Sequence, residues 1–122
     1  MMPRLLEEQE IRWIGASYGD LLRFPKLARR EAGFQLSKVQ WNIEPDDWKP
    51  FEEVGAGVRE IRIRDASGAF RVMYVAKFEE AVYVLHCFHK KSRTTSKLDK
   101  EIVSTRYRAL VAARDNRRKK SK

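Results

Sequence analysis

Cysteine and histidine are scarce in this 122-residue chain, and long apolar runs are absent. Cys87 is the single cysteine, so the chain cannot form an internal disulfide, and a reducing compartment, the cytoplasm, is the expected location. Because Cys87 is joined by just two histidines, His86 and His89, no metal site built from Cys and His is expected. No apolar stretch approaches the roughly 18 residues that a membrane-spanning helix needs, so the sequence predicts no membrane partner.

The composition is that of one small folded domain. Hydrophobic residues make up 43% of the chain and charged residues 35%, which excludes a disordered or membrane-embedded protein. We predict a single domain over residues 1–113, without internal repeats, followed by a basic, flexible tail over residues 114–122. The tail carries six basic residues and one acid, with no apolar residue to anchor it, so it is expected to serve solubility or sequence-independent electrostatics.

Charge is distributed unevenly along the chain. Residues 1–57 contain 8 Lys and Arg against 10 Asp and Glu, a net charge of −2. Residues 58–122 contain 18 against 7, a net charge of +11, which gives the total of +9. The basic half also contains the strand-rich part of the sequence, and cations fixed on a rigid sheet suit a polyanion. Nucleic acid is therefore the first partner to consider.

The acidic half predicts an edge strand, two helices and a loop. A short strand over residues 11–14 comes first, and Ser17 is a candidate N-cap for a short helix over residues 20–24. A second helix begins at Pro25 and carries an apolar stripe at spacings of three and four residues: Ala28, Ala32, Leu36 and Val39. The two helices should therefore cover one side of a sheet. Proline, glycine and asparagine punctuate residues 42–57, which we predict to be a loop.

The basic half predicts a three-stranded antiparallel meander and a closing helix. In residues 58–65, isoleucines alternate with arginines, which is typical of a strand with one buried and one cationic face. The turn Asp65-Ala66-Ser67-Gly68 leads into a second strand over residues 70–76. Residues 82–88 are apolar on both faces and are expected at the centre of the sheet. A capping box at Ser96 starts a helix that should bury Leu98, Ile102, either Tyr107 or the stem of Arg106, and Leu110.

Three stretches of the basic half resemble a known toxin family. Residues 57–65 (GVREIRIRD), 70–75 (FRVMYV) and 82–91 (VYVLHCFHKK), in this order, resemble the phage-derived, HigB-like branch of the RelE/ParE toxin superfamily. Residues 48–50 and Phe24-Pro25 are similar to that branch as well, and the resemblance covers roughly residues 11–112. It implies a RelE-like α+β fold, in which two N-terminal helices pack on a small antiparallel sheet of three or four strands and a C-terminal helix follows.

The resemblance also implies a function. Members of this branch are toxins of type II toxin–antitoxin systems, so a cognate helix-turn-helix antitoxin, HigA-like, is expected to bind over the basic surface and neutralise this chain. RelE-like members are mRNA endonucleases (mRNA interferases) that need no metal or other cofactor and commonly act on the ribosome. ParE-like members instead inhibit DNA gyrase, and a non-catalytic nucleic-acid-binding module is a third interpretation. The superfamily alone does not decide the target.

Metal-free cleavage lets the ribose 2′-hydroxyl attack the adjacent phosphate, so the site must take up a proton, stabilise added negative charge and protonate the leaving 5′-oxygen. By resemblance, Arg71 and Arg62 would contact the phosphate. Lys91 or Lys90 would hold the substrate, and His89 would shuttle protons. The residues selected as catalytic are Arg71, His89, Lys91 and Arg62. Those selected as RNA-binding are Arg59, Arg64, Lys90, Arg93 and Lys97. RNA-cleaving relatives often use a tyrosine near the C-terminus, but residues 90–106 contain none.

Each of these residues also has a purely structural interpretation. The arginines of the first strand could be the solvated face of an amphipathic strand, and Arg71 could form a structural ion pair with Glu60. The lysines after the last strand could belong to a solvated loop, and His89 could be a surface residue at a strand end. His86 and Cys87, which lie between apolar residues, are expected in the core. The nuclease hypothesis requires the basic groups to converge on one surface sized for a phosphodiester.

Overall fold

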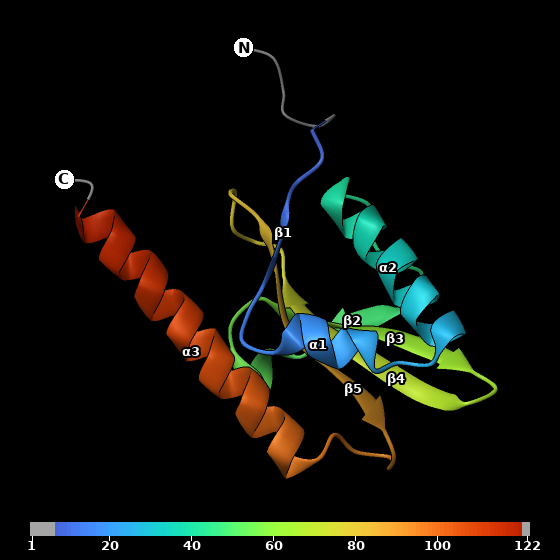
Figure 1. Ribbon diagram of the computed structural model, residues 1–122. Helices are drawn as coiled ribbons and strands as arrows, with labels where there is room; N and C mark the ends of the chain where they lie inside the picture. Colours follow the sequence, from blue (N-terminus) through green and yellow to red (C-terminus); the bar gives the residue numbers. More distant parts are fainter. Residues whose placement is uncertain (1–6, 121–122) are drawn as a thin grey trace.

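The computed structural model describes residues 7–120. This part of the chain forms five strands, three α-helices and one short 3-10 helix (Figure 1): β1 (Ile11–Trp13), α1 (Ser17–Leu22), α2 (Lys26–Gln40), β2 (Trp48–Pro50), η1 (Glu52–Val54), β3 (Val58–Asp65), β4 (Gly68–Val75), β5 (Val82–Lys90) and α3 (Lys97–Lys120). The strands form one sheet in the order β1-β5-β4-β3-β2. The expected α+β class and the closing helix are confirmed.

The sheet differs from the expected antiparallel sheet of three or four strands, because it is mixed and has five. β1 pairs in parallel with β5, with Ile11 opposite Val82, whereas the other pairs are antiparallel. The strand expected at residues 11–14 is present, but its partner lies about 70 residues away, and a local pattern does not identify such a partner. β2 lies inside the predicted loop. Its Pro50 indicates a loop in the sequence, because proline cannot donate a backbone hydrogen bond. Proline is nevertheless tolerated on an edge strand, where one side of the backbone needs no partner.

α1 and α2 cover one face of the sheet (Figure 1). The apolar stripe predicted for α2 is buried in full, as expected: Ala28, Ala32, Leu36 and Val39. Ser17 is not an N-cap, because α1 begins at Ser17 itself and Ala16 occupies the cap position. The Ser17 side chain is buried, and its hydroxyl donates a hydrogen bond to the carbonyl oxygen of Val84 at 3.0 Å. It ties α1 to β5 at the point where the pairing with β1 ends.

α3 and the segment around η1 pack against the other face. Ser96 caps α3 as expected, since the Asp99 N–H donates to Ser96 Oγ at 3.0 Å; the Asp99 carboxylate accepts from the Ser96 hydroxyl at 2.7 Å, where a full capping box would use the Ser96 backbone N–H. Leu98 was expected in the core but is 66% exposed. The helical phase explains the difference, because Val103 and Leu110 point to the sheet and are buried, so Leu98 lies on the solvent side of the first turn.

His86 fixes the start of α3 to the rest of the protein. Its buried ring lies between two carboxylates, with Nε2 2.8 Å from Asp99 Oδ1 and Nδ1 3.5 Å from Asp20 Oδ2 of α1. Arg106 completes the cluster, because its Nη1 donates to the carbonyl oxygen of Leu85 at 2.8 Å and lies 3.4 Å from Asp20 Oδ2. The prediction that His86 is a core residue is confirmed.

The far end of α3 differs from the expected tail. The helix continues through residues 114–120, and residues 121 and 122 of the predicted tail lie outside the described residues. Arg114 Nε donates to Glu80 Oε2 at 2.7 Å, and the Arg114 guanidinium lies 3.7 Å from the ring centroid of Phe78. Positive charge in the last turn also suits the negative end of a helix dipole. The boundary at residue 113 and the mobility of this end stay predictions. Among residues 7–120, none of the helices has the length and apolarity that crossing a membrane requires.

Candidate nucleic-acid interface

The sheet register gathers basic side chains on the face that carries α3. Residues directly opposite each other in neighbouring strands point to the same side of a sheet. One cross-strand row is Arg64, Ala69 and Lys90, the next is Arg62, Arg71 and Phe88, and Lys49 of β2 lies opposite Glu60. The β3–β4 hairpin projects away from α3, which packs over the other end of this face (Figure 1). We call this surface the basic face; its charged residues are Lys49, Glu60, Arg62, Arg64, Arg71 and Lys90.

A β-bulge decides which residues at the end of β5 join the basic face. The register shifts between Met73 and Tyr74, where β5 has one extra residue, Leu85. The extra residue reverses the side-chain alternation of everything that follows it. Lys90 therefore points to the basic face and His89 to the opposite one. A regular strand would have exchanged the two.

Arg71 is the most buried cation of the basic face. It is 4% exposed and Glu60 beside it is 2% exposed. Arg71 Nη1 donates to the carbonyl oxygen of Phe70 at 3.0 Å, whereas Arg71 Nε lies 3.8 Å from Glu60 Oε1, too far for a hydrogen bond. Within residues 7–120, neither Arg71 Nε nor Glu60 Oε2 has a hydrogen-bond partner. The ion pair considered from the sequence is present, but it leaves hydrogen-bonding capacity of both groups unused.

The electrostatics of the basic face are unfavourable for an isolated protein. Burial lowers the pKa of the Arg71 guanidinium; Glu60 opposes this effect, and Arg62 and Arg64 add to it. The pKa of Lys90 is also lowered, first by burial and then by the charge of Arg71. Arg62 lies directly opposite Arg71, and like charges at such positions destabilise a sheet. A bound phosphate would relieve this repulsion, which is the behaviour expected of a binding site.

Two of the residues selected from the sequence lie on the other side of the sheet. Arg59 is opposite Tyr74, whose ring belongs to the core beneath α2, and the Arg59 guanidinium lies 4.3 Å from the ring centroid of Trp48. His89 stacks on Phe70, with ring centroids 4.6 Å apart and an angle of 22° between the ring planes. Neither residue therefore shares the surface of Arg71.

The remaining selected residues follow β5. Lys91 and Arg93 lie in the segment before α3, Lys97 is the first residue of that helix, and all three are exposed. Lys90 Nζ donates to the carbonyl oxygen of Arg93 at 2.8 Å, which folds this segment against the end of β5. The segment thus borders the basic face and can add cations to its rim.

Lys49 and Glu60 belong to the basic face although neither is among the residues selected from the sequence. The alternation of a strand contains the necessary signal, because Glu60 is two positions from Arg62 and so shares its side. The same rule separates Arg59 from Arg62. No sequence pattern predicts the side of the sheet on which Lys49 lies, since its short strand interrupts a segment rich in turn residues.

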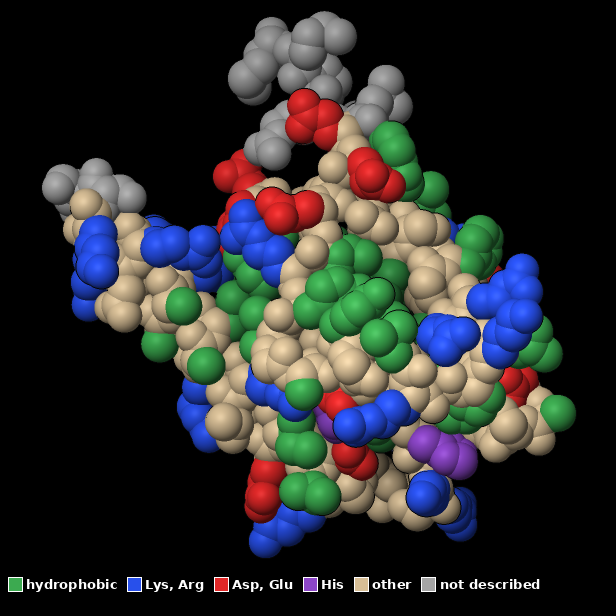
Figure 2. Space-filling model, viewed as in Figure 1, with side chains coloured by type: hydrophobic (Ala, Val, Ile, Leu, Met, Phe, Trp, Pro, Cys, Tyr) green, Lys and Arg blue, Asp and Glu red, His purple; other side chains and the backbone are tan. Residues whose placement is uncertain are grey.

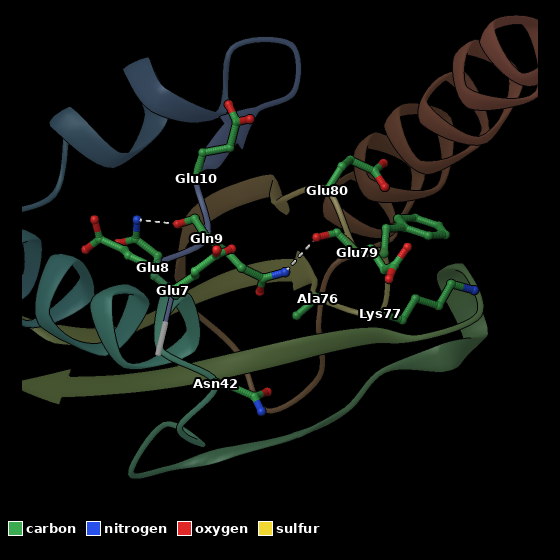
Figure 3. Close-up of a pocket in the computed structure, with 11 residues that line it drawn as sticks. Glu7, Glu8, Gln9, Glu10, Asn42, Ala76, Lys77, Glu79 and Glu80 are labelled. Atoms are coloured by element: carbon green, nitrogen blue, oxygen red, sulfur yellow. Dashed lines mark hydrogen bonds between the residues drawn. The ribbon is translucent and has the colours of Figure 1, made fainter. Parts of the chain in front are cut away.

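A cleft near the start of the described chain is not suited to nucleic acid. It measures about 480 Å³ and lies between the start of the described chain and the β4–β5 turn (Figure 3). Gln9 bridges it, because its Nε2 donates to the carbonyl oxygen of Glu79 at 3.0 Å and its own carbonyl oxygen accepts a hydrogen bond from Gln40 at 2.8 Å. The charged residues that line it are mostly acidic: Glu7, Glu8, Glu10, Lys77, Glu79 and Glu80. Carboxylates of this density repel a polyanion.

A second group of cations lies away from the sheet. Figure 2 shows Lys and Arg side chains along the projecting end of α3, while Asp and Glu side chains gather near the start of the described chain. The last turn of α3 contains four basic residues: Arg117, Arg118, Lys119 and Lys120. Exposed charges of this kind attract nucleic acid without positioning it. The rigid, partly desolvated cations of the basic face are therefore the better candidates for chemistry.

Comparison with known protein families identifies the relationship of this chain. The family described as Phage derived protein Gp49-like (DUF891) matches residues 19–108, which begin within α1 and include the whole basic face and the first half of α3. The chain belongs to the Gp49-like family. None of the curated proteins compared with it matches this chain.

The Gp49-like family is part of the RelE/ParE-like toxin superfamily, so the resemblance stated from the sequence is confirmed at this level. Assignment to the HigB-like branch stays a prediction. Gp49-like proteins are toxin-like and occur in toxin–antitoxin contexts, which implies an antitoxin as a partner. The family suggests nuclease activity without specifying the nucleic acid that is cleaved.

Proposed function

We propose that this chain is the toxin of a type II toxin–antitoxin system and that it cleaves mRNA on the basic face. The observation that supports this most strongly is the environment of Arg71, a nearly buried guanidinium among other cations with Glu60 as its neighbouring carboxylate. A charge that served solubility alone would stay in water, because burying it without full hydrogen bonding is costly. Such an arrangement is typical of a site that meets an anionic ligand.

The reaction is a transesterification within the RNA strand. The 2′-oxygen bonds to phosphorus and the bond from phosphorus to the 5′-oxygen breaks, which leaves a 2′,3′-cyclic phosphate and a 5′-hydroxyl. Negative charge on the phosphate increases in the transition state. Arg71 and Arg62, opposite each other on β4 and β3, are placed to stabilise that charge, and partial burial strengthens their effect.

Proton transfer requires an acceptor for the 2′-hydroxyl proton and a donor for the 5′-oxygen. We assign the acceptor role to Glu60, the carboxylate of the basic face, whose Oε2 has no hydrogen-bond partner within the described residues; because this oxygen is buried, RNA binding has to uncover it. Lys90 is assigned the donor role, because its lowered pKa makes its proton easier to release. The mechanism gives no step to His89, which lies on the other side of the sheet. Lys49, Arg64 and the cations after β5 would hold the RNA backbone.

The test is cleavage of a defined mRNA by the purified protein, with and without ribosomes and with and without EDTA. We expect cleavage that survives chelation and fragments with 5′-hydroxyl ends, which a polynucleotide kinase labels directly. Arg71→Ala and Arg62→Ala should each lower the cleavage rate about 10²–10³-fold, the cost of removing one transition-state donor. Arg59→Ala is the matched control, since Arg59 is on the same strand as Arg62 but faces away. Equal losses in Arg59→Ala and Arg62→Ala would contradict the proposed site.

Two alternative functions, a gyrase-inhibiting toxin and a non-catalytic binding module, can be tested with the same purified protein. Inhibition of DNA supercoiling without RNA cleavage would support the first. RNA binding without cleavage, unchanged in toxicity by Arg71→Ala, would support the second. The proposed partner is a HigA-like helix-turn-helix antitoxin whose acidic surface covers the basic face. Its addition should stop cleavage and protect Lys90 from chemical modification.

A further inference from the structure

A second cleft lies next to the basic face, where the corner between α1 and α2, the β3–β4 turn and the end of β5 meet. It measures about 390 Å³, within the range of roughly 300–1,000 Å³ that small ligands occupy. Phe24 and Phe70 form an aromatic floor on the α2 side of the sheet, and Phe88, whose ring belongs to the core on the α3 side, lines the cleft from β5; all three are less than 10% exposed. Arg23 and His89 are exposed at its rim. The acidic cleft described above has no comparable apolar floor.

The aromatic rings of this second cleft form a row that ends at the surface. Phe24 and Phe70 have ring centroids 4.9 Å apart with their planes tilted by 48°, and His89 stacks on Phe70 at 4.6 Å with the ring planes 22° apart. The His89 ring also lies across Gly68, where a Cβ atom would come within 2.5 Å of His89 Nε2. One side of the ring is therefore held by packing while the residue remains exposed. Rigid aromatic platforms of this kind bind unstacked bases of single-stranded nucleic acids.

Phe88 connects this cleft with the proposed catalytic residues. It lines the cleft, and on β5 it lies directly opposite Arg71. β1 pairs with β5 at residues 82–84, and α1 packs against β5 next to this pairing; within residues 7–120 no further strand pairs with that edge toward Lys90. A strand of RNA can therefore pass around the edge of β5, with a phosphate on the basic face and an adjacent base on the other side.

We propose that the cleft lined by Phe24, Phe70, Phe88 and His89 is a nucleobase subsite, which holds one base of the RNA bound on the basic face. The proposal rests on the proposed function, because it takes RNA as the ligand. The base stacks on His89 above the apolar floor. Asp20 and Ser67 at the rim offer oxygen atoms to the amino groups of a base, and Arg23, whose side chain is 83% exposed, can contact the next phosphate. An apolar floor favours a base over a second phosphate.

The test separates binding from cleavage by using 2′-O-methyl RNA, in which the attacking hydroxyl is blocked. Fluorescence anisotropy measures the Kd of one labelled oligonucleotide and of a set in which one base at a time is replaced by an abasic residue. At one or two adjacent positions, removing the base should weaken binding by the wild-type protein about tenfold or more. The same removal should have an effect below about twofold in His89→Ala, whereas His89→Phe should retain the wild-type pattern because it keeps the stacking surface.

Arg62→Ala is the matched control, since it should weaken binding of every oligonucleotide equally. Equal binding of all abasic strands by a wild-type protein that cleaves natural RNA would overturn the subsite and leave the proposed function standing. Absence of both binding and cleavage would overturn the proposed function, and the subsite with it. If both His89 variants lose cleavage while the abasic pattern is unchanged, His89 transfers protons and the subsite proposal is wrong.

Discussion

Replacing Glu60 by methionine should destabilise this protein far more than replacing Arg71. The two groups are 2% and 4% exposed, and their closest charged atoms are 3.8 Å apart. At an effective dielectric constant of about 20, an attraction over this distance is about 4 kcal/mol. Glu60→Met removes it and leaves Arg71 among cations alone, so we expect a loss of about 3–5 kcal/mol in the free energy of unfolding.

Arg71→Met has a different effect, because the carboxylate that it leaves behind still has cations around it. Arg62 and Lys49 lie beside Glu60, and the charge of Glu60 is also felt at Lys90. The repulsion between Arg62 and Arg71 disappears at the same time. We therefore expect Arg71→Met to stay within about 1 kcal/mol of the wild type, and the double variant to lose about 1–2 kcal/mol, a coupling of about 2–3 kcal/mol.

Urea unfolding followed by tryptophan fluorescence, with linear extrapolation to water, measures all four proteins. Raising the salt concentration to 1 M, where the Debye length is about 3 Å, should reduce the penalty of Glu60→Met, because part of it is repulsion among cations near the surface. Equal losses in the two single variants, or simple additivity in the double variant, would refute this account of the basic face.

Two further predictions concern the packing of α3. Hydrogen bonds from Arg114 lower the pKa of Glu80 from 4.5 to about 2, so the contribution of Glu80 to stability is complete above pH 4.5 and is lost as the pH falls toward 2. The difference in unfolding free energy between wild type and Glu80→Gln should be about 1–2 kcal/mol at pH 7 and should vanish near pH 2. A difference that stays constant with pH would contradict this role of Glu80. Gly55→Ala should lower the free energy of unfolding by about 1–3 kcal/mol, because the added Cβ would lie 2.6 Å from the ring of Tyr107. The control is Gly33→Ala, in a helix with open space around it, which should raise the free energy of unfolding by about 0.5–1 kcal/mol. Thermal unfolding measures both variants.

The parts of the fold that the sequence predicts are those whose determinants are local. The stripe of α2 repeats within one helix, and the β3–β4 hairpin has alternation on both sides of a turn, so both can be recognised without knowing what they contact. The parallel pairing of β1 depends on a partner at the other end of the chain. β2 is three residues long and includes Pro50, so it offers too short a pattern to recognise.

The candidate site divides in the same way. Arg62, Arg64 and Arg71 share one face, as strand alternation and hairpin pairing predict. The bulge at Leu85 places Lys90 on the basic face and His89 on the opposite face. The sequence near Leu85 contains no glycine or proline that would mark such a bulge. His89, a residue type suited to proton transfer, therefore lies on the face opposite Arg71. Burial of Glu60 likewise depends on neighbours from other strands, with Lys49 of β2 and Met73 of β4 directly opposite it.

Parallel pairing between the first strand and the last one sets the order in which this protein can be completed during translation. Ile11 leaves the ribosome early, but its partner Val82 follows several seconds later at about 5–20 residues per second. The hydrogen bond from Ser17 to Val84 has to wait for the same event. Lys90, synthesised later still, is the last cation to join its neighbours on the sheet. The basic face therefore cannot be complete before the end of β5 has been synthesised and has paired with β4.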